Sequence, residues 1–369
     1  MRFLKRNLAY RGLLLAIVLL LVPRVGLQAQ SDGVVPPPAS YEEVAESYAA
    51  AVQLAATEGP EIVQLFLDND IETLYDRLAV DFQAQVTLEQ LQGYYDQLMA
   101  VTPIGDQVHT RTASISGMQL YSAQHAWSDT DLALTAGFNE AGEVSYLNLQ
   151  PVTALPEDPA ADYESDVIFQ LPFEGLWYTF WGGDNALDNY HVDAPPQRHA
   201  YDFVIWRDGS TFTGEGTKPQ DYYVYGQTIL APAAGEVITV VNDLPDMQPQ
   251  VETDAENPAG NHVVLQVAED EYLFLAHMQP GSILVEEGDT VEAGQPIGLV
   301  GNSGNTSEPH LHIHLQNTSE LLAYDVEGAI TGFAEGAYGL PLRFSDYLAN
   351  GEEVQLGEPV GSQFVQNAP

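Results

Sequence analysis

The chain has 369 residues, with 53 acidic against 11 basic side chains, a formal net charge of −42 and no cysteine. Its length predicts about two domains, and a hydrophobic content of 45% is enough for at least one sizeable core. The lack of cysteine excludes disulfides, thiol catalysis and cysteine metal ligands. The acidity argues against nucleic acid and against anionic membranes as partners, and it is typical of a solvated surface.

The extreme N-terminus differs in composition from the rest of the chain. Four basic residues up to Arg11 precede an apolar run, Gly12 to Val22, which is shorter than the ~20 residues that a membrane-spanning helix needs. We predict a signal peptide over residues 1–29 with cleavage after Ala29, and an uncleaved anchor is the alternative. Cleavage would leave six bases against 53 acids, a net charge of −47. The protein is then expected to be extracellular or in the cell envelope, without a stable membrane partner.

The first predicted domain covers residues 41–152 and follows a proline-bearing linker, residues 30–40. Apolar positions three and four apart predict helices from Tyr41 to about Met99, and Thr87 to Gln90 has the pattern of a capping box. Alternating residues from about Gln107 to Gln150 predict a strand meander. This stretch resembles the nuclear-transport-factor-like α+β cone domains found ahead of some secreted bacterial enzymes. No chemistry is assigned to it, and its histidines, His109 and His125, are expected to be structural.

A second linker, residues 153–168, is acidic and contains proline. Short apolar runs between glycine and proline then predict a mainly antiparallel β domain over residues 169–350, followed by a C-terminal tail, residues 351–369. Two long polar loops, near residues 207–226 and 242–261, are expected to border a functional cleft. The predicted fold class is therefore α+β, a small cone-like domain followed by a β domain.

Histidines are concentrated in this second domain, where seven of the nine lie between His191 and His314. On a strand, His310, His312 and His314 would project from one face, because side chains alternate. Imidazoles in register favour a zinc site, which also needs a ligand from another segment. Asp202 is the candidate, since it lies in an apolar strand where a buried acid without a cation would be costly.

These residues resemble the lysostaphin/LytM-type zinc metallopeptidases. The resemblance covers roughly Leu171 to Asn317 and is carried by Glu308-Pro309-His310-Leu311-His312-Ile313, by the preceding Gly301-Asn302-Ser303-Gly304 and by Leu275-Ala276-His277-Met278. It implies a mostly antiparallel β domain with an open groove that cleaves peptide bonds in peptidoglycan. It also implies that His312 and Asp202 bind Zn²⁺, and that His310 and His277 handle protons or hold the transition state.

One position departs from the family pattern, which has a histidine four residues before the aspartate. This chain has Arg198 there, so another residue must supply the first ligand. His199 is nearest in sequence, but a strand would direct it to the opposite face. We favour His191, from the preceding turn-rich stretch. The predicted metal ligands are therefore His191, Asp202 and His312, with His277 and His310 as the catalytic pair; His314 is expected to support the ligands or to be exposed.

Three other classes of protein share features with this sequence. Residues 285–295 resemble a lipoyl or biotinyl carrier hairpin, but the modifiable lysine is missing. Ser303 could suggest a serine hydrolase, yet the surrounding residues miss the G-x-S-x-G pattern. The main rival is a catalytically inactive LytM-like module that binds cell wall or activates another hydrolase.

Overall fold

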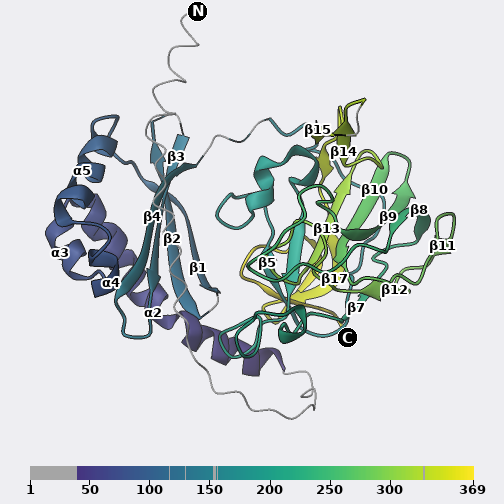
Figure 1. Cartoon of the computed structure of the whole chain (residues 1–369), viewed down its shortest axis with the longest axis horizontal. Helices are drawn as coiled ribbons and strands as arrows, with labels where there is room; N and C mark the ends of the chain where they lie inside the picture. The colour runs from purple at the N-terminus through teal and green to yellow at the C-terminus, as the bar shows by residue number, and fades with distance from the viewer. Residues whose placement is uncertain (1–39, 116, 129, 153–154, 156, 327–328) are drawn as a thin grey trace, which may run out of the picture. The chain divides into compact units, whose positions relative to one another are not determined.

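The computed structural model describes residues 40–115, 117–128, 130–152, 155, 157–326 and 329–369 (Figure 1). The predicted signal peptide lies outside the described residues. Two compact units are present: residues 51–152 form unit 1, and residues 40–50 together with 155–369 form unit 2, so the division falls inside the first helix. Among the described residues, no helix is both long and apolar enough to cross a membrane.

Unit 1 combines helices with an antiparallel sheet. Its helices are α2 (Tyr41–Leu67, which begins in unit 2), α3 (Ile71–Asp76), α4 (Val80–Gln83) and α5 (Leu88–Met99). The sheet has the order β1-β2-β3-β4, with β1 (Gln107–Ile115), β2 (Met118–Trp127), β3 (Thr130–Phe138) and β4 (Val144–Val152). The capping box at Thr87 and Gln90 is confirmed at the start of α5. The resemblance to cone domains stays a prediction.

Unit 2 is built mainly from antiparallel strands. Its large sheet has the order β11-β8-β9-β10-β13-β6-β5-β19-β17-β18 among the described residues, and β16 pairs with β13. Two small sheets, β12-β7 and β14-β15, complete it. The strands are β5 (Trp177–Trp181), β6 (Tyr201–Val204), β7 (Thr228–Leu230), β8 (Gly235–Val241), β9 (Asn261–Ala268), β10 (Glu271–Met278), β11 (Thr290–Val291), β12 (Pro296–Leu299), β13 (Leu311–Gln316), β14 (Leu322–Tyr324), β15 (Ile330–Phe333), β16 (Gly339–Leu340), β17 (Phe344–Ala349), β18 (Glu352–Gly357) and β19 (Phe364–Asn367). Short 3₁₀ turns are η1 (Tyr190–Asp193), η2 (Pro195–Gln197) and η3 (Pro219–Asp221).

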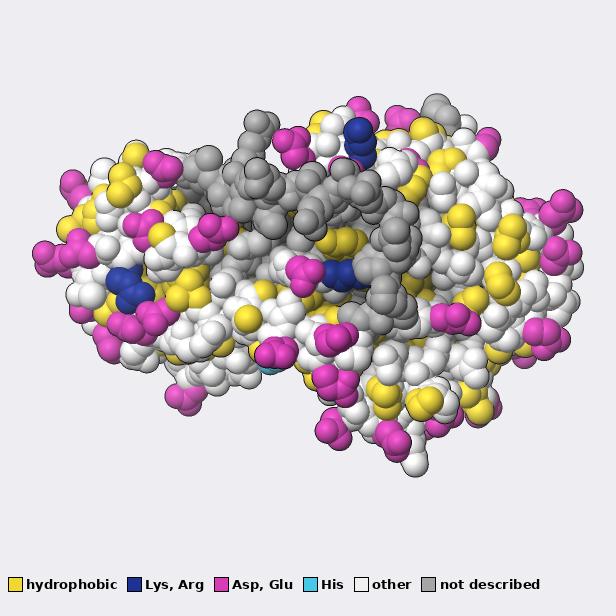
Figure 2. Space-filling view, turned by 90° about the horizontal axis from the view of Figure 1, so that it is seen from below, with side chains coloured by type: hydrophobic (Ala, Val, Ile, Leu, Met, Phe, Trp, Pro, Cys, Tyr) yellow, Lys and Arg dark blue, Asp and Glu magenta, His cyan; other side chains and the backbone are white. Residues whose placement is uncertain are grey.

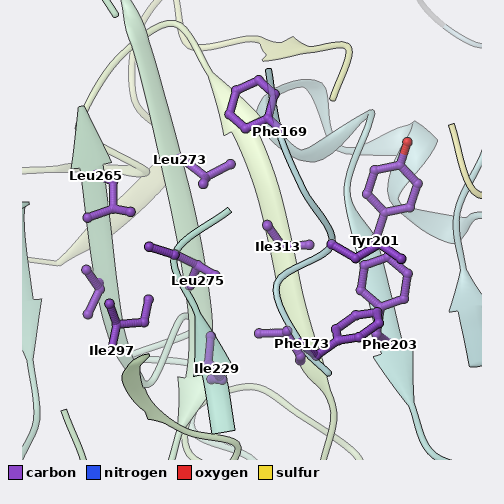
Figure 3. Close-up of a cluster of buried hydrophobic side chains, with 14 of the residues drawn as sticks. Phe169, Phe173, Tyr201, Phe203, Ile229, Leu265, Leu273, Leu275, Ile297 and Ile313 are labelled. Carbon is purple, nitrogen blue, oxygen red and sulfur yellow. The ribbon is translucent and has the colours of Figure 1, made fainter. Parts of the chain in front are cut away.

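The hydrophobic core of unit 2 lies on one face of this sheet. Side chains from neighbouring strands meet there, among them Leu273, Ile313 and Phe203 (Figure 3). The alternate residues of β13 therefore carry the polar side chains to the other face, because successive side chains on a strand point in opposite directions. All six residues of β13 are buried, so that second face is also covered.

Two predicted segments are placed differently by the structure. Residues 351–369 are not a tail, because β18 and β19 pair with β17, and β19 also pairs with β5. Most of the predicted linker, residues 153–168, belongs to unit 2. Its Tyr163 and Ser165 hydroxyls each donate to the carboxylate of Glu271, both at 2.6 Å. Both segments are polar and irregular in sequence, a pattern typical of unpacked chain, but their few apolar and hydroxyl groups contact the sheet.

Acidic side chains are spread over the face that Figure 2 shows rather than gathered at one place on it. Figure 2 shows Asp and Glu scattered over the visible face, with Lys and Arg at only a few positions. This distribution fits a solvated acidic surface.

Candidate metal centre

The centre of the site is set by the pairing of β13 with β6. His312 lies directly opposite Asp202 in this antiparallel register, and on its other side it faces Ala276 of β10. His312 Nδ1 is 2.9 Å from Asp202 Oδ1, and both side chains are buried. A buried carboxylate thus meets an imidazole that lies 110 residues away in the sequence.

His191 reaches the same carboxylate from η1. Its Nε2 is 3.6 Å from Asp202 Oδ2 and makes no hydrogen bond to any described residue, although the ring is buried. Its Nδ1–H donates to Asn189 Oδ1 at 2.9 Å, so the lone pair is on the Nε2 that faces Asp202. Burial lowers the pKa of His191 to about 3, which keeps the ring neutral, the form that binds metals.

His310 and His277 flank this group, with ring centroids 4.7 Å apart. The Nδ1–H of His310 donates to the carbonyl of Glu308, and that of His277 donates to the carbonyl of Ser303, both at 2.8 Å. In these tautomers each ring keeps a lone pair on Nε2. His310 Nε2 is 3.4 Å from Asp202 Oδ1 and is buried without a well-formed hydrogen bond among the described residues.

The backbone at His277 has a φ of 59°, in the left-handed region that few residues other than glycine adopt. The residue lies where the register of β10 against β9 shifts between Leu275 and Met278. This irregularity turns the side chain away from the regular alternation of the strand.

A hydrogen-bonded row along β13 fixes the tautomer of His312. Gln316 Nε2 donates to the carbonyls of Thr318 and Glu320, at 2.6 and 3.0 Å, so its Oε1 must face His314 Nε2 at 3.2 Å. His314 therefore carries its proton on Nε2 and accepts at Nδ1, 2.9 Å from His312 Nε2. His312 must then carry its proton on Nε2.

This tautomer directs the Nδ1 lone pair of His312 at the carboxylate of Asp202. Two acceptors at 2.9 Å repel each other unless a cation lies between them. A proton could bridge this pair alone, but the unpartnered Nε2 of His191 points at the other carboxylate oxygen. Ligand atoms of His191, Asp202 and His312 all lie within 4.8 Å of one another, as do those of His277, His310 and His312. Two nitrogens and one oxygen suit Zn²⁺ with an open fourth position.

His199, the alternative first ligand, does not join this group. Its Nε2 is 3.0 Å from the carboxylate of Asp158. Arg198, at the position of the family's histidine, is buried and directed to the carbonyl of Val192 and to the same Asp158. Asp158 comes from the segment that had been predicted to be a linker, so the sequence pattern could not reveal this partner.

A cavity of about 210 Å³ opens beside the site. Asp202 and His310 line it, together with Glu308 and a row of aromatic side chains. Burial raises the pKa of Glu308 to about 7, an effect that the nearby His310 partly offsets. Thr211 Oγ1, at 3.3 Å, and Gln250 Nε2, at 3.5 Å, donate to its carboxylate, and they come from the two long loops expected to border a cleft.

Sequence reasoning overlooked Asn189, Gln316 and Glu308 as site residues. Two signals in the sequence were available. Asn189 lies two residues before the candidate ligand His191, and Gln316 continues the alternation of His312 and His314. Ser303 has a structural role, because its hydroxyl donates to the carbonyl of Met278 and accepts from the backbone of Asn261, both at 2.8 Å.

A buried cluster of histidines around one aspartate on an antiparallel β sheet could hold a metal ion. The profile of Peptidase family M23 matches residues 220–323, which include His277, His310 and His312 but begin after Asp202. Unit 2 therefore carries a domain of the lysostaphin/LytM-type peptidase family, M23.

Known proteins resemble this chain over limited stretches. The peptidoglycan DD-endopeptidase ShyA of Vibrio cholerae is 44% identical over 57 residues, which is 15% of this chain and 13% of ShyA. A zinc-containing peptidase from Vibrio cholerae is 15% identical with a TM-score of 0.24, covering 54% of this chain and 52% of that one. The catalytic domain of lysostaphin from Staphylococcus simulans is 17% identical with a TM-score of 0.23, covering 42% of this chain and 86% of that domain. The chain thus spans only a small part of ShyA.

Proposed function

We propose that the protein is an exported zinc metalloendopeptidase that hydrolyses peptide bonds in peptidoglycan cross-links or stem peptides. The observation that carries the proposal is the pair of imidazole lone pairs, His312 Nδ1 and His191 Nε2, that face the two oxygens of Asp202. The family membership of unit 2 and its limited similarity to a peptidoglycan endopeptidase support the substrate class.

In this proposal His191, Asp202 and His312 hold the zinc ion. A zinc ion held by these residues would lower the pKa of a water molecule and polarise the scissile carbonyl. Asn189 holds His191 in the tautomer that binds through Nε2, and the row of His314 and Gln316 holds His312 in the tautomer that binds through Nδ1.

His310 and His277 move the protons. Each keeps a lone pair on Nε2 because its Nδ1–H is bound to a backbone carbonyl, so each can accept a proton at that atom. Burial lowers the pKa of His310, but Asp202 and Glu308 outweigh it and the net shift is upward, which suits the residue that carries a proton to the leaving amine. Burial is the main cause that lowers the pKa of His277, and the charges of His310 and His312 lower it further. A lowered pKa suits a residue that is neutral and accepts a proton.

Zinc content and hydrolysis of soluble peptidoglycan fragments test the proposal together. We expect about one zinc ion per chain by elemental mass spectrometry after loosely bound metal is removed. His312→Ala should lose both metal and hydrolysis, whereas His310→Ala should keep the metal and lose roughly 10²- to 10⁴-fold in turnover. Wild-type protein that takes up no zinc when it is supplied would overturn the enzyme and favour an inactive binding or activating module.

Export is tested separately. If the signal peptide is removed as proposed, the N-terminal sequence of the protein recovered outside the cytoplasm should begin at Gln30. Recovery of protein that begins at Met1 in the membrane fraction would favour the uncleaved anchor.

A further inference from the structure

The cavity beside the candidate metal centre contains an acidic group that the proposed chemistry does not use. Glu308 lines this cavity and is 9% exposed. Its carboxylate has only two long hydrogen bonds, at 3.3 and 3.5 Å, from neutral side chains, although a carboxylate can accept about four. Among the described residues, no Lys or Arg forms an ion pair with it.

The lining of the cavity also includes three aromatic side chains. Trp181 contacts Phe180 and Tyr190, with ring centroids 5.5 and 5.4 Å apart, and all three rings line the cavity with Glu308. Aromatic faces attract cations, and a carboxylate accepts hydrogen bonds from an ammonium group. No Lys or Arg lines the cavity, and His310 is the one basic side chain among its lining residues.

We propose that this cavity binds a primary ammonium group of the substrate, and that Glu308 is the residue that selects it. The substrate would then be a peptide with a free amine close to the scissile bond, because the same cavity is lined by Asp202 and His310. This inference deepens the proposed peptidase function and rests on it for the identity of the ligand as a substrate.

A structural role for Glu308 is the competing explanation, since its partners Thr211 and Gln250 belong to two different loops. The two roles differ in what Glu308→Gln does. A glutamine has the same shape and keeps an acceptor for Thr211, and the Gln250 amide can turn so that its oxygen accepts from the new amide nitrogen. The loops then stay connected, but the charge that an ammonium requires is removed.

The experiment compares soluble peptidoglycan fragments with free amines and the same fragments acetylated with acetic anhydride. Zinc-loaded wild type, Glu308→Gln, Glu308→Asp and a control, Glu269→Gln at an exposed turn, are tested. Binding is followed by tryptophan fluorescence after rapid mixing, and cleavage by chromatography. Zinc content and circular dichroism establish that each variant is folded and loaded.

We expect wild type and Glu269→Gln to bind the free-amine fragments about tenfold or more tightly than the acetylated ones. Glu308→Gln should reduce this preference to within about twofold, and Glu308→Asp should retain part of it. Equal binding of both fragments by wild type, or a preference that Glu308→Gln leaves intact, would overturn the inference. Amine-dependent binding without cleavage would instead overturn the proposed peptidase and leave the ammonium site standing.

Discussion

At the scale of single residues, the choice of the first metal ligand depends on two histidines eight positions apart. His191 faces Asp202, whereas His199 is paired with Asp158. We therefore expect His191→Ala to lower zinc affinity by more than the 10- to 100-fold typical of losing a supporting partner, since it removes a proposed direct ligand. His199→Ala is the matched control and should change zinc affinity little. Chelator competition measures both, and metal loss in His199→Ala alone would exchange their roles.

Glu308 should also leave a signature in stability. Burial raises its pKa from 4.5 to about 7, so the folded state binds more protons than the unfolded state between these values and loses stability as pH rises through them. A shift of this size corresponds to ~3 kcal/mol at most. Glu308→Gln should thus match wild type near pH 4 and be more stable above about pH 7. Urea unfolding at both pH values measures this; a gain that is independent of pH would contradict it.

At the scale of the element, β13 combines two functions because its side chains alternate. Leu311, Ile313 and Leu315 belong to the core, whereas His312, His314 and Gln316 form the buried polar row. The alternation can be predicted from the sequence. The role of Gln316 cannot, because the carbonyls of Thr318 and Glu320 set the orientation of its amide.

His314→Phe tests this row. The new ring can keep the stacking on Phe274, where the ring centroids are 4.6 Å apart, but it cannot accept the Nε2–H of His312. Zinc affinity should fall about 10- to 100-fold, while far-UV circular dichroism stays unchanged. His314→Gln, which offers an acceptor, should recover part of the affinity. Unaltered zinc affinity in the Phe variant would show that the row does not orient His312.

The C-terminal strands provide a second test at this scale. Val365 of β19 is fully buried, and Leu356 of β18 is 59% exposed. Val365→Asp should destabilise unit 2 by roughly 3 kcal/mol or more, because it buries an unpaired charge. Leu356→Asp should change the unfolding free energy by only about 0.5 kcal/mol. Thermal unfolding distinguishes them, and equal, small effects would restore the view of residues 351–369 as a tail.

At the scale of the whole molecule, the net charge of −42 should make stability depend on salt. Like charges repel in the compact state, and added salt screens them. Raising NaCl from about 0.02 M to about 0.5 M should increase Tm by at least about 2 °C at neutral pH, roughly 1 kcal/mol for domains of this size. Calorimetry measures the shift, with an equal osmolality of an uncharged solute as the control. A Tm that falls or stays constant would mean that specific ion pairs outweigh the general repulsion.

Local patterns in the sequence are enough to predict the family of the second domain and the residues of its candidate site. The signals are local and therefore visible in the sequence: the spacing of His310 and His312, the apolar strand around Asp202 and the segment at His277. The alternation of side chains along a strand is also a local rule. Four features depend on the tertiary structure: the contact of Asp158 with His199, the contact of Asn189 with His191, the orientation of the Gln316 amide and the pairing of β19. Each is a contact whose partner is chosen by the packing of elements or by the course of a loop, which no periodicity in the sequence records. The orientation of lone pairs toward Asp202 is likewise a property of the assembled hydrogen-bond network, since a proton's position on an imidazole follows from its neighbours.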